Sequence, residues 1–233
     1  MSEAAPAPAV SIIVPVLDEA AGICAVLDAL QPFRATGAEV IVVDGGSADD
    51  TVALAAPRCD RVIAAARGRA TQMNAGAAVS RGALLLFLHA DTLLPPEAPA
   101  LLRELSARPP VWGRFDVTLG GTHPLLRLVA TMMNWRSRLT AVATGDQAIF
   151  VSRELFAACG GFPSLPLMED IALSKRLRRV RAPVCLAPRV ESSGRRWERG
   201  GLWRTVGLMW GLRLGYFLGV DPIRLARWYR HAR

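Results

Sequence analysis

Short apolar runs alternate with helical patterns along the first half of the chain. The runs are rich in Val, Ile and Leu and predict strands at residues 10–16, 39–44 and 84–88. Between them the sequence predicts helices at residues 20–30, 50–55 and 69–79. Strands that alternate with helices in this way indicate βαβ units around a mostly parallel sheet. We therefore expect an α/β fold whose sheet is flanked by helices.

Each of the three predicted strands runs into acidic or turn-forming residues. The first is followed by Glu19, the second ends on Asp44 before two glycines, and the third continues through His89 to Asp91. The carboxyl ends of parallel strands open onto the ligand crevice of such folds, so we expect the three acids to converge there. Two interpretations of Asp91 stay open, a residue that binds an ion or ligand and a cap for the following turn.

Composition limits the class of protein. The chain has 233 residues, of which 52% are hydrophobic, so it can bury the core of one domain with an appendage. Its four cysteines lie far apart, without a CxxC pair or a neighbouring histidine, which favours buried free thiols in a reducing cytoplasm over a metal site. Residues 1–9 lack the basic and apolar regions of a signal peptide, and we expect a disordered tail there.

Charge divides the chain unevenly. Residues 1–120 hold 9 Arg and Lys against 13 Asp and Glu, whereas residues 121–233 hold 19 against 7. The acidic half contains the predicted crevice. The basic half predicts an anionic partner, such as nucleic acid, a lipid surface or phosphate groups.

Residues 123–142 have the pattern of an amphipathic helix. The apolar positions at helical spacing are Leu125, Leu128, Val129, Met132, Trp135 and Leu139. The polar positions on another face are Arg127, Thr131, Asn134 and Arg138. Such a helix either packs on the domain or lies at a membrane surface.

Residues 201–220 are apolar over nearly the length needed to cross a bilayer, but Arg213 lies deep within them. We therefore expect a helix that lies on a membrane or packs on protein, and no transmembrane span. Its glycines recur every four residues, at Gly207, Gly211, Gly215 and Gly219. This small-residue stripe predicts close packing with another helix, either of the same chain or of a second subunit in a homodimer.

Five blocks in order along residues 10–180 carry a family resemblance. They are SIIVPVLDEA, VIVVDGGSADDT, GRATQMNAGAAVSRGALLLFLHADT, GDQAIFVSRELFAACGGF and MEDIALSKRL. Together they resemble the inverting glycosyltransferases of family 2, which have the GT-A fold, a Rossmann-like and mostly parallel sheet flanked by helices. The chain is most similar to the small bacterial branch labelled arsenosugar-biosynthesis glycosyltransferases. The resemblance implies transfer of a sugar from a nucleotide-diphosphate sugar to an acceptor hydroxyl.

The resemblance also implies a donor site on the first half of the chain. Pro15 and Glu19 match positions that line the nucleobase pocket, and Asp44 matches the acid that hydrogen-bonds the base or the ribose. Taken without the family, Pro15 and Glu19 would be a strand end and a first-turn acid. Arg67 and Arg69 precede a predicted helix, where guanidinium groups suit a diphosphate, although most such pairs are solvated surface arginines.

Asp91 matches the last acid of the family's DxD motif, which binds a divalent cation between the two donor phosphates. The expected cofactor is therefore Mg²⁺ or Mn²⁺, which take oxygen ligands. The first acid of the motif is replaced by His89. Three roles for His89 stay open: it ligates the metal, orients Asp91 or contacts the sugar.

The catalytic base is expected in the block MEDIALSKRL. Attack by an acceptor hydroxyl needs a group that takes its proton. Glu169 and Asp170 lie in the first turn of a predicted helix, whose dipole keeps a carboxylate ionised. The family pattern assigns the base to Asp170 and leaves Glu169 beside the acceptor. Asp146 is the second candidate base and suits acceptor binding better, and Gly161 is expected to shape the acceptor wall.

The segment SSGRRWERGG resembles the QxxRW motif of processive polysaccharide synthases through Arg196 and Trp197. Ser193 stands in place of the Gln, and the long transmembrane segments of those synthases are missing. This argues against processive polymerisation. Arg195 or Arg196 is still expected to cover the donor diphosphate, with a surface arginine as the alternative.

These features predict a GT-A domain at residues 10–190 and basic amphipathic helices at residues 191–233. We expect a cytoplasmic enzyme, peripheral at the inner face of the cell membrane. Two alternatives are a nucleotidyltransferase of related fold, which lacks its usual phosphate loop here, and a non-catalytic basic module that binds anionic lipid or nucleotide. Nucleic acid is not expected, because the crevice acids would repel its phosphates and no nucleic-acid motif is found.

Overall fold

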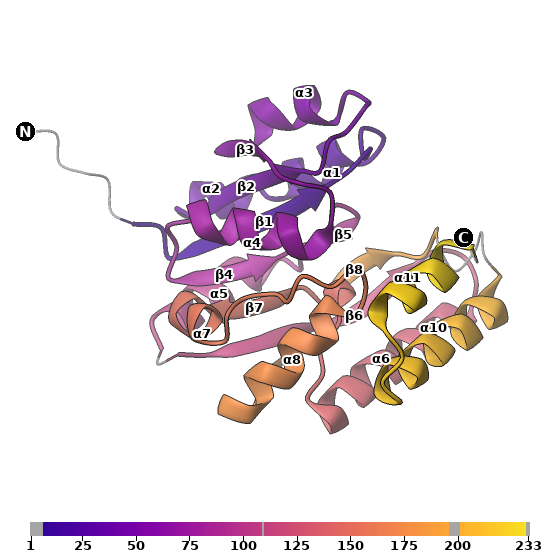
Figure 1. Ribbon diagram of the computed structural model, residues 1–233. Coiled ribbons are helices and arrows are strands. Elements are labelled where there is room, and N and C mark those ends of the chain that lie inside the picture. Colours follow the sequence, from indigo (N-terminus) through magenta and orange to yellow (C-terminus); the bar gives the residue numbers. More distant parts are fainter. Residues whose placement is uncertain (1–6, 109, 196–200, 232–233) are drawn as a thin grey trace, which may run out of the picture.

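The computed structural model describes residues 7–108, 110–195 and 201–231. A single sheet runs through the molecule in the order β3-β2-β1-β4-β7-β6-β8-β5 (Figure 1). The strands are β1 (Val10–Val16), β2 (Glu39–Asp44), β3 (Arg61–Ala64), β4 (Leu84–Phe87), β5 (Thr92–Leu93), β6 (Trp112–Gly120), β7 (Ile149–Ser152) and β8 (Val184–Ser193). Strands β3, β2, β1 and β4 are parallel, β7 is antiparallel to its two neighbours, and β6 and β8 are parallel. The α/β fold with a mostly parallel sheet is confirmed.

Three strands of the parallel half form where the sequence predicts them, whereas β3 was not predicted. Strands β1 and β2 have the predicted bounds, and β4 ends one residue before the last predicted position. All residues of β2 and β4 are buried, because helices cover both faces of the sheet. Alternate residues of β1 enter two separate cores, Ile12 and Val14 on one face and Ile13 on the other. Continuous apolar runs are the usual sequence of strands buried on both faces.

The helices form two layers around the sheet. One layer holds α1 (Ile23–Ala29), α2 (Gln31–Ala35), α3 (Thr51–Ala55), α5 (Ala98–Ser106) and α6 (Leu125–Thr140). The other holds α4 (Arg69–Val79), α7 (Arg153–Ala158) and α8 (Glu169–Val180). Helix α4 packs closely because Gly76 has no side chain, and a Cβ there would lie 2.5 Å from Ile13 Cγ2. Two short 3₁₀ turns are also present, η1 (Ala56–Arg58) and η2 (Gly145–Gln147).

Helix α6 is where the sequence predicts a helix, but Asn134 of its expected polar face is buried. The Asn134 side chain receives a hydrogen bond from the Val117 N–H (2.8 Å) and donates one to the Val117 carbonyl (2.9 Å). Beside it, Ser137 accepts a hydrogen bond from the buried guanidinium of Arg114, which also pairs with Asp116. This polar network on β6 fixes the buried side of α6, and an apolar face points outward as a result.

The C-terminal helices α10 (Leu202–Phe217) and α11 (Pro222–His231) pack against the domain. Leu212 and Leu225 join Met168 and Ile171 in a small third core. Lys175 of α8 places its ammonium group 4.7 Å from the centre of the Tyr216 ring, a cation–π contact between α8 and α10. No helix within the described residues is long and apolar enough to cross a membrane. The predicted domain limits stay a prediction.

The glycine stripe is corrected by the structure. Gly219 is not part of it, because α10 ends at Phe217 and Gly219 turns the chain with φ +85°, in the left-handed region that favours glycine.

 A Cβ at Gly207 or Gly211 would meet nothing within 4 Å, whereas one at Gly215 would lie 3.1 Å from Leu225 of α11. Within the described part of the chain, the stripe therefore meets a helix at Gly215 alone, and the homodimer stays a prediction.

The four cysteines are free thiols, as predicted. Only Cys59 is fully buried, and the other three are half-buried. Burial raises the pKa of the Cys59 thiol, so it stays protonated at neutral pH.

Candidate active site

The buried end of β2 shapes one wall of the crevice. The carboxylate of Asp44 accepts hydrogen bonds from the Gly46 N–H (3.0 Å) and from the Ser47 hydroxyl (2.6 Å). Gly46 adopts φ +91°, which a residue with a side chain rarely takes. Asp44 therefore holds the turn after β2, and its edge toward the crevice is the part that a donor would use.

The loops after β1 and β2 are tied to each other. Asp18 donates from its N–H to the Ser47 hydroxyl (3.0 Å), and its carboxylate accepts from the Ala48 N–H (2.8 Å). The Glu19 N–H donates to the Thr51 hydroxyl (2.8 Å). These bonds fix the backbone of Glu19 at the mouth of the crevice.

Glu19 and Asp91 face each other across that mouth. Burial raises the pKa of the Glu19 carboxyl, the negative charge of Asp91 raises it further, and Arg195 and Arg69 act in the opposite direction. Asp91 is half-buried in the turn after β4, where the Thr92 N–H donates to the His89 carbonyl (3.1 Å). Two carboxylates and two arginines thus share one opening, which suits a ligand that carries phosphate groups.

His89 turns away from the mouth toward Asp146. Its Nδ1 lies 3.4 Å from an Asp146 carboxylate oxygen. Its ring also packs on Gly145, where an added Cβ would lie 2.3 Å from Nε2. Any side chain at position 145 would displace the imidazole. Of the three roles left open for His89, this geometry favours neither metal ligation nor a contact with Asp91, and it pairs the ring with Asp146.

The first turn of α8 brings Glu169 and Asp170 to the same place. Asp170 accepts hydrogen bonds from the Gly145 N–H (2.9 Å) and from the Ile171 N–H (2.7 Å), so its carboxylate is held in a fixed orientation. Glu169 is buried, and its pKa is raised by that burial and by the charge of Asp170. Met168 precedes them with φ +68°, an uncommon value for a side-chain-bearing residue.

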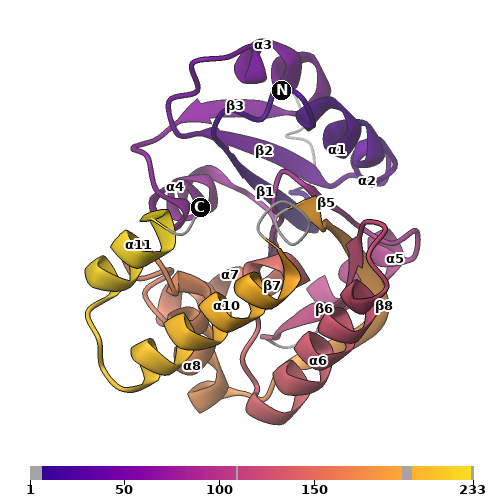
Figure 2. The same ribbon diagram turned by 90° about the vertical axis from the view of Figure 1, so that its right-hand side faces the viewer.

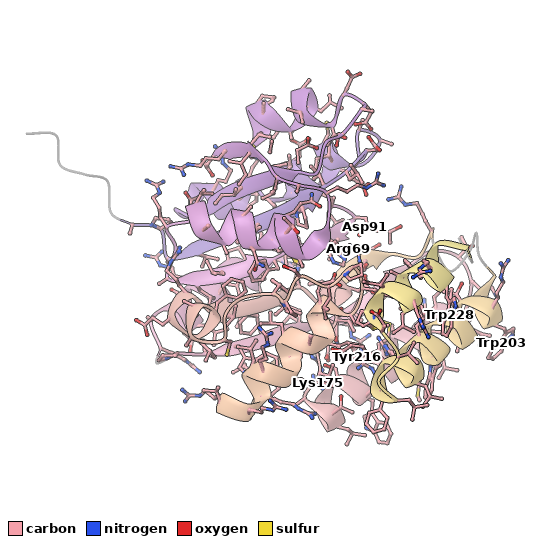
Figure 3. The ribbon with its side chains drawn as sticks, in the orientation of Figure 1. Arg69, Asp91, Lys175, Trp203, Tyr216 and Trp228 are labelled. Atoms are coloured by element: carbon pink, nitrogen blue, oxygen red, sulfur yellow. The ribbon has the colours of Figure 1, made fainter. Side chains whose placement is uncertain are left out.

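Arg69, the first residue of α4, reaches these acids from the opposite side of the crevice. Loss of bulk water would lower the pKa of its guanidinium, but the carboxylates of Glu169 and Asp146 outweigh this and raise it. Arg69 keeps access to solvent, and it lies with Asp91 where the first half of the chain meets the C-terminal helices (Figure 3). It can therefore contact a ligand that enters from either side.

A pocket joins these groups to the C-terminal helices. Its lining residues are Arg69, His89, Thr144, Gly145, Asp146, Leu167, Met168, Glu169, Asp170, Ile171, Met209, Leu212, Arg213 and Tyr229. Burial lowers the pKa of the Arg213 guanidinium, and the carboxylates of Asp170 and Asp146 act against it. The pocket therefore offers oriented carboxylates to take a proton and two arginines to hold negative charge.

No group of three His, Cys, Asp or Glu side chains in residues 7–108, 110–195 and 201–231 forms a ready metal centre. A cation at Asp91 would therefore need further oxygen ligands from a bound substrate.

The sequence profile described as Glycosyl transferase family 2 matches residues 11–156, which is more than half of the chain. The chain belongs to glycosyl transferase family 2. The matched residues run from β1 to α7 and include the crevice, whereas Glu169, Asp170 and the C-terminal helices lie outside them.

Curated relatives of this family 2 chain include proteins named "PGL/p-HBAD biosynthesis glycosyltransferase" from Mycobacterium bovis and Mycobacterium tuberculosis. They are 38% identical over 104 residues, which is 42% of this chain and 40% of theirs. The chain thus matches less than half the length of these relatives.

Solved structures share the fold. A mannosyltransferase from Pyrobaculum calidifontis, in complex with GDP-Man and Mn²⁺, has a TM-score of 0.65 at 21% identity and covers 98% of this chain and 69% of its own. S. aureus TarS 1–349 with UDP-GlcNAc has a TM-score of 0.60 at 18% identity, over 79% of this chain and 58% of its own. Glucosyl-3-phosphoglycerate synthase from Mycobacterium tuberculosis, with Mn²⁺ and UDP, has a TM-score of 0.58 at 22% identity, over 78% and 70%. At these identities the likeness shows the fold.

Some predicted site residues of the family 2 chain lie away from the pocket. Pro15 is half-buried within β1, and Arg67 is exposed before α4. Gly161 lies in a turn with φ +65°, where a Cβ would lie 2.8 Å from the Asn74 side-chain oxygen, and it is not among the lining residues. Arg196 lies outside the described residues.

Sequence reasoning missed the pocket residues of the C-terminal helices. The charge of Arg213 within an apolar segment argues against a membrane span. The same charge also indicates a pocket residue, because a buried arginine needs acidic neighbours. Tyr229 carries no comparable signal. Arg195 was not missed: it is one of the two arginines expected to cover the donor diphosphate, and its charge acts on Glu19 at the mouth.

Proposed function

We propose that the protein is a metal-dependent, inverting glycosyltransferase that moves a sugar from a nucleotide-diphosphate sugar to an acceptor hydroxyl. The observation that carries this proposal is the placement of Asp170. Its fixed carboxylate lies in a pocket that also holds Arg69, and the Glu19 and Asp91 mouth is close to Arg69. Family 2 membership and the nucleotide-bound structural neighbours support the same reading.

The donor is proposed to lie along the crevice, with its nucleoside toward Pro15, Glu19 and Asp44. Its diphosphate would lie near Arg69 and Arg195, whose guanidinium groups already act on the Glu19 carboxyl. Arg67 and Arg196 stay predicted donor residues. The base and the sugar of the donor are left open by these contacts, since none of them is specific for one nucleotide.

The residues at the mouth fit a divalent cation. Glu19 and Asp91 place two carboxylates together, and burial, followed by the negative charge of Asp91, raises the pKa of the Glu19 carboxyl. Asp91 would hold Mg²⁺ or Mn²⁺, with the remaining ligands from the donor phosphates and water. Such an ion stabilises the negative charge that develops on a leaving diphosphate. Two of the structural neighbours contain Mn²⁺.

Asp170 is proposed as the general base. It takes the proton of the acceptor hydroxyl as the oxygen attacks the anomeric carbon, and the bond from that carbon to the diphosphate breaks. Attack from the side opposite the leaving group inverts the anomeric configuration. Asp146 is less suited to this step because it pairs with His89, and with Glu169 it is placed to bind the acceptor. The assignment to the arsenosugar branch, the cytoplasmic location and the homodimer stay predictions.

Thermal unfolding with UDP or GDP, with and without Mn²⁺, tests the proposal. A ligand that binds only the folded state raises the unfolding temperature, by about 2.7 kcal/mol of stability at a hundredfold excess over its dissociation constant. We expect one nucleoside diphosphate to stabilise the protein in the presence of Mn²⁺, and Asp91→Asn to remove the Mn²⁺ dependence. Asp50→Asn is the matched control, because Asp50 is an exposed acid at the start of α3 whose side chain makes no capping hydrogen bond. Equal nucleotide binding by the native protein and Asp91→Asn, with the same response to Mn²⁺, would contradict the metal role.

A further inference from the structure

Helix α6 exposes a line of large apolar side chains. Leu128, Met132, Trp135 and Leu139 are 47–68% exposed. Their spacing of four, three and four residues places them on one side of the helix. The opposite side of α6 is held on β6 by Asn134 and its hydrogen bonds, so this apolar line faces solvent in the single chain.

Helices α10 and α11 expose similar side chains. On α10, Trp203, Trp210, Leu214 and Phe217 are 59–77% exposed and also follow a helical line. On α11, Trp228 is 54% exposed. Leaving side chains of this size in water is unfavourable, so a surface that holds many of them indicates a partner.

These side chains gather on one side of the molecule. Helices α6, α10 and α11 lie together on the side that faces the viewer in Figure 2, and Trp203 and Trp228 lie at that side in Figure 3. Fourteen large apolar side chains are exposed among the described residues, and eleven belong to these helices and the turn after α10. We name the exposed apolar residues of α6, α10 and α11 the tryptophan face.

The charge of the tryptophan face selects its partner. Arg127, Arg204, Arg224 and Arg227 are exposed on the same three helices, and none of these helices contains Asp or Glu. A second copy of the chain would bring the same arginines against each other in a two-fold contact, without acids to pair them. An anionic bilayer offers both an apolar interior for the side chains and negative headgroups for the arginines.

We propose that the tryptophan face docks on an anionic membrane, with α6, α10 and α11 lying in its headgroup region. The inner sides of the same C-terminal helices line the pocket through Leu212, Arg213 and Tyr229. Docking therefore places the pocket beside the bilayer. If the protein has the proposed function, an acceptor beside the bilayer is an amphiphile whose hydroxyl lies at the headgroup level.

Vesicle co-sedimentation of the full chain tests the docking without any substrate. We expect binding to vesicles of phosphatidylglycerol and phosphatidylcholine in equal parts, and weak binding to phosphatidylcholine alone. Trp135→Glu and Trp210→Glu should each weaken binding roughly tenfold, because each removes a large apolar group that would be buried in the bilayer. Val180→Glu is the matched control, since Val180 is 66% exposed on α8, outside the tryptophan face.

The arginines are tested separately from the apolar side chains. The double variant Arg204→Gln and Arg227→Gln should bind anionic vesicles several-fold more weakly, and Arg103→Gln on α5 should bind like the native protein. Native binding should weaken between about 0.1 and 0.5 M NaCl and persist, because salt screens charge but not apolar insertion.

Three results would overturn the proposal. The first is that the native protein does not bind anionic vesicles. The second is that Trp135→Glu and Val180→Glu bind these vesicles equally well. The third is that sedimentation shows a dimer that Trp135→Glu dissociates, because a second copy of the chain would then cover the tryptophan face. Nucleotide binding with Mn²⁺ in the absence of lipid separates the two proposals. If nucleotides bind and vesicles do not, the docking proposal is wrong and the proposed enzyme function is retained. If vesicles bind and nucleotides do not, the enzyme fails and the docking stands.

Discussion

The two halves of the molecule present their chemistry in different ways. In the first half, Asp44 ends a parallel strand, and Glu19 and Asp91 lie a few residues after one, so neighbours in the sheet bring the three acids to the same edge. The pocket takes most of its lining from η2, α8, α10 and α11 of the second half, which are separated in the sequence and meet only through tertiary packing, and Arg69 and His89 join it from the first half. The proposed donor side thus follows from strand order, whereas the proposed acceptor side depends on tertiary packing.

The difference teaches how far sequence patterns carry. A strand end is recognised from a few residues, because the apolar run and the acid that ends it are adjacent. A pocket wall made by a helix depends on which face of the helix turns inward, and a helix that is apolar on several sides does not specify that face. Helix α10 is such a case, with Leu212 buried and Leu214 exposed.

The largest expected effect separates the two halves by their roles. Asp170→Asn should lower the rate of transfer by about 10²-fold or more, because the amide cannot take the acceptor proton. Nucleotide binding with Mn²⁺ should be unchanged, since the donor mouth at Glu19 and Asp91 is intact. Rate measurements with a donor that supports turnover, beside thermal unfolding with nucleotide, check both parts.

Asp146→Asn is the matched control for this experiment. It keeps a polar group near His89 and should cost less in rate than Asp170→Asn. If Asp146→Asn abolishes transfer and Asp170→Asn retains it, the roles of the two acids are reversed and the base belongs to the His89 pair.

Much of the fold could be predicted from the sequence, but only part of the site. The strands β1, β2 and β4 and the helix α4 were predicted nearly to the residue, since their patterns are strong and uninterrupted. The strands β3, β5, β6, β7 and β8 were missed. Strand β6 carries Arg114 and Asp116, which pair with each other and are buried, so charges interrupt the apolar pattern that marks a strand. The acids of the site were found from their positions, whereas their partners, such as Gly145 for Asp170, depend on packing.

A substitution of Asn134 tests why the apolar line of α6 faces outward. Asn134→Ala removes the side chain that satisfies both the N–H and the carbonyl of Val117, and leaves two buried polar groups without it. We expect a loss of about 1–3 kcal/mol in the free energy of unfolding, the usual cost of an unsatisfied buried group. Thermal or denaturant unfolding measures this loss. Thr131→Ala, at an exposed position on the same helix, should change stability far less.

If the two variants lose the same stability, the hydrogen bonds of Asn134 do not fix the helix. The outward position of Trp135 would then need another cause.

The smallest expected effect concerns the glycines of α10. Gly211 faces open space, so Gly211→Ala should stabilise the protein by up to about 1 kcal/mol through the higher helix propensity of alanine. Gly215→Ala gains the same propensity but places its Cβ 3.1 Å from Leu225, so its net gain should be smaller or reversed. Thermal unfolding of the two variants at matched concentrations gives the comparison. A Gly211→Ala variant that is less stable than the native protein, with a shift that depends on protein concentration, would show that a second subunit covers this glycine, and the stripe would then act between chains and not within one.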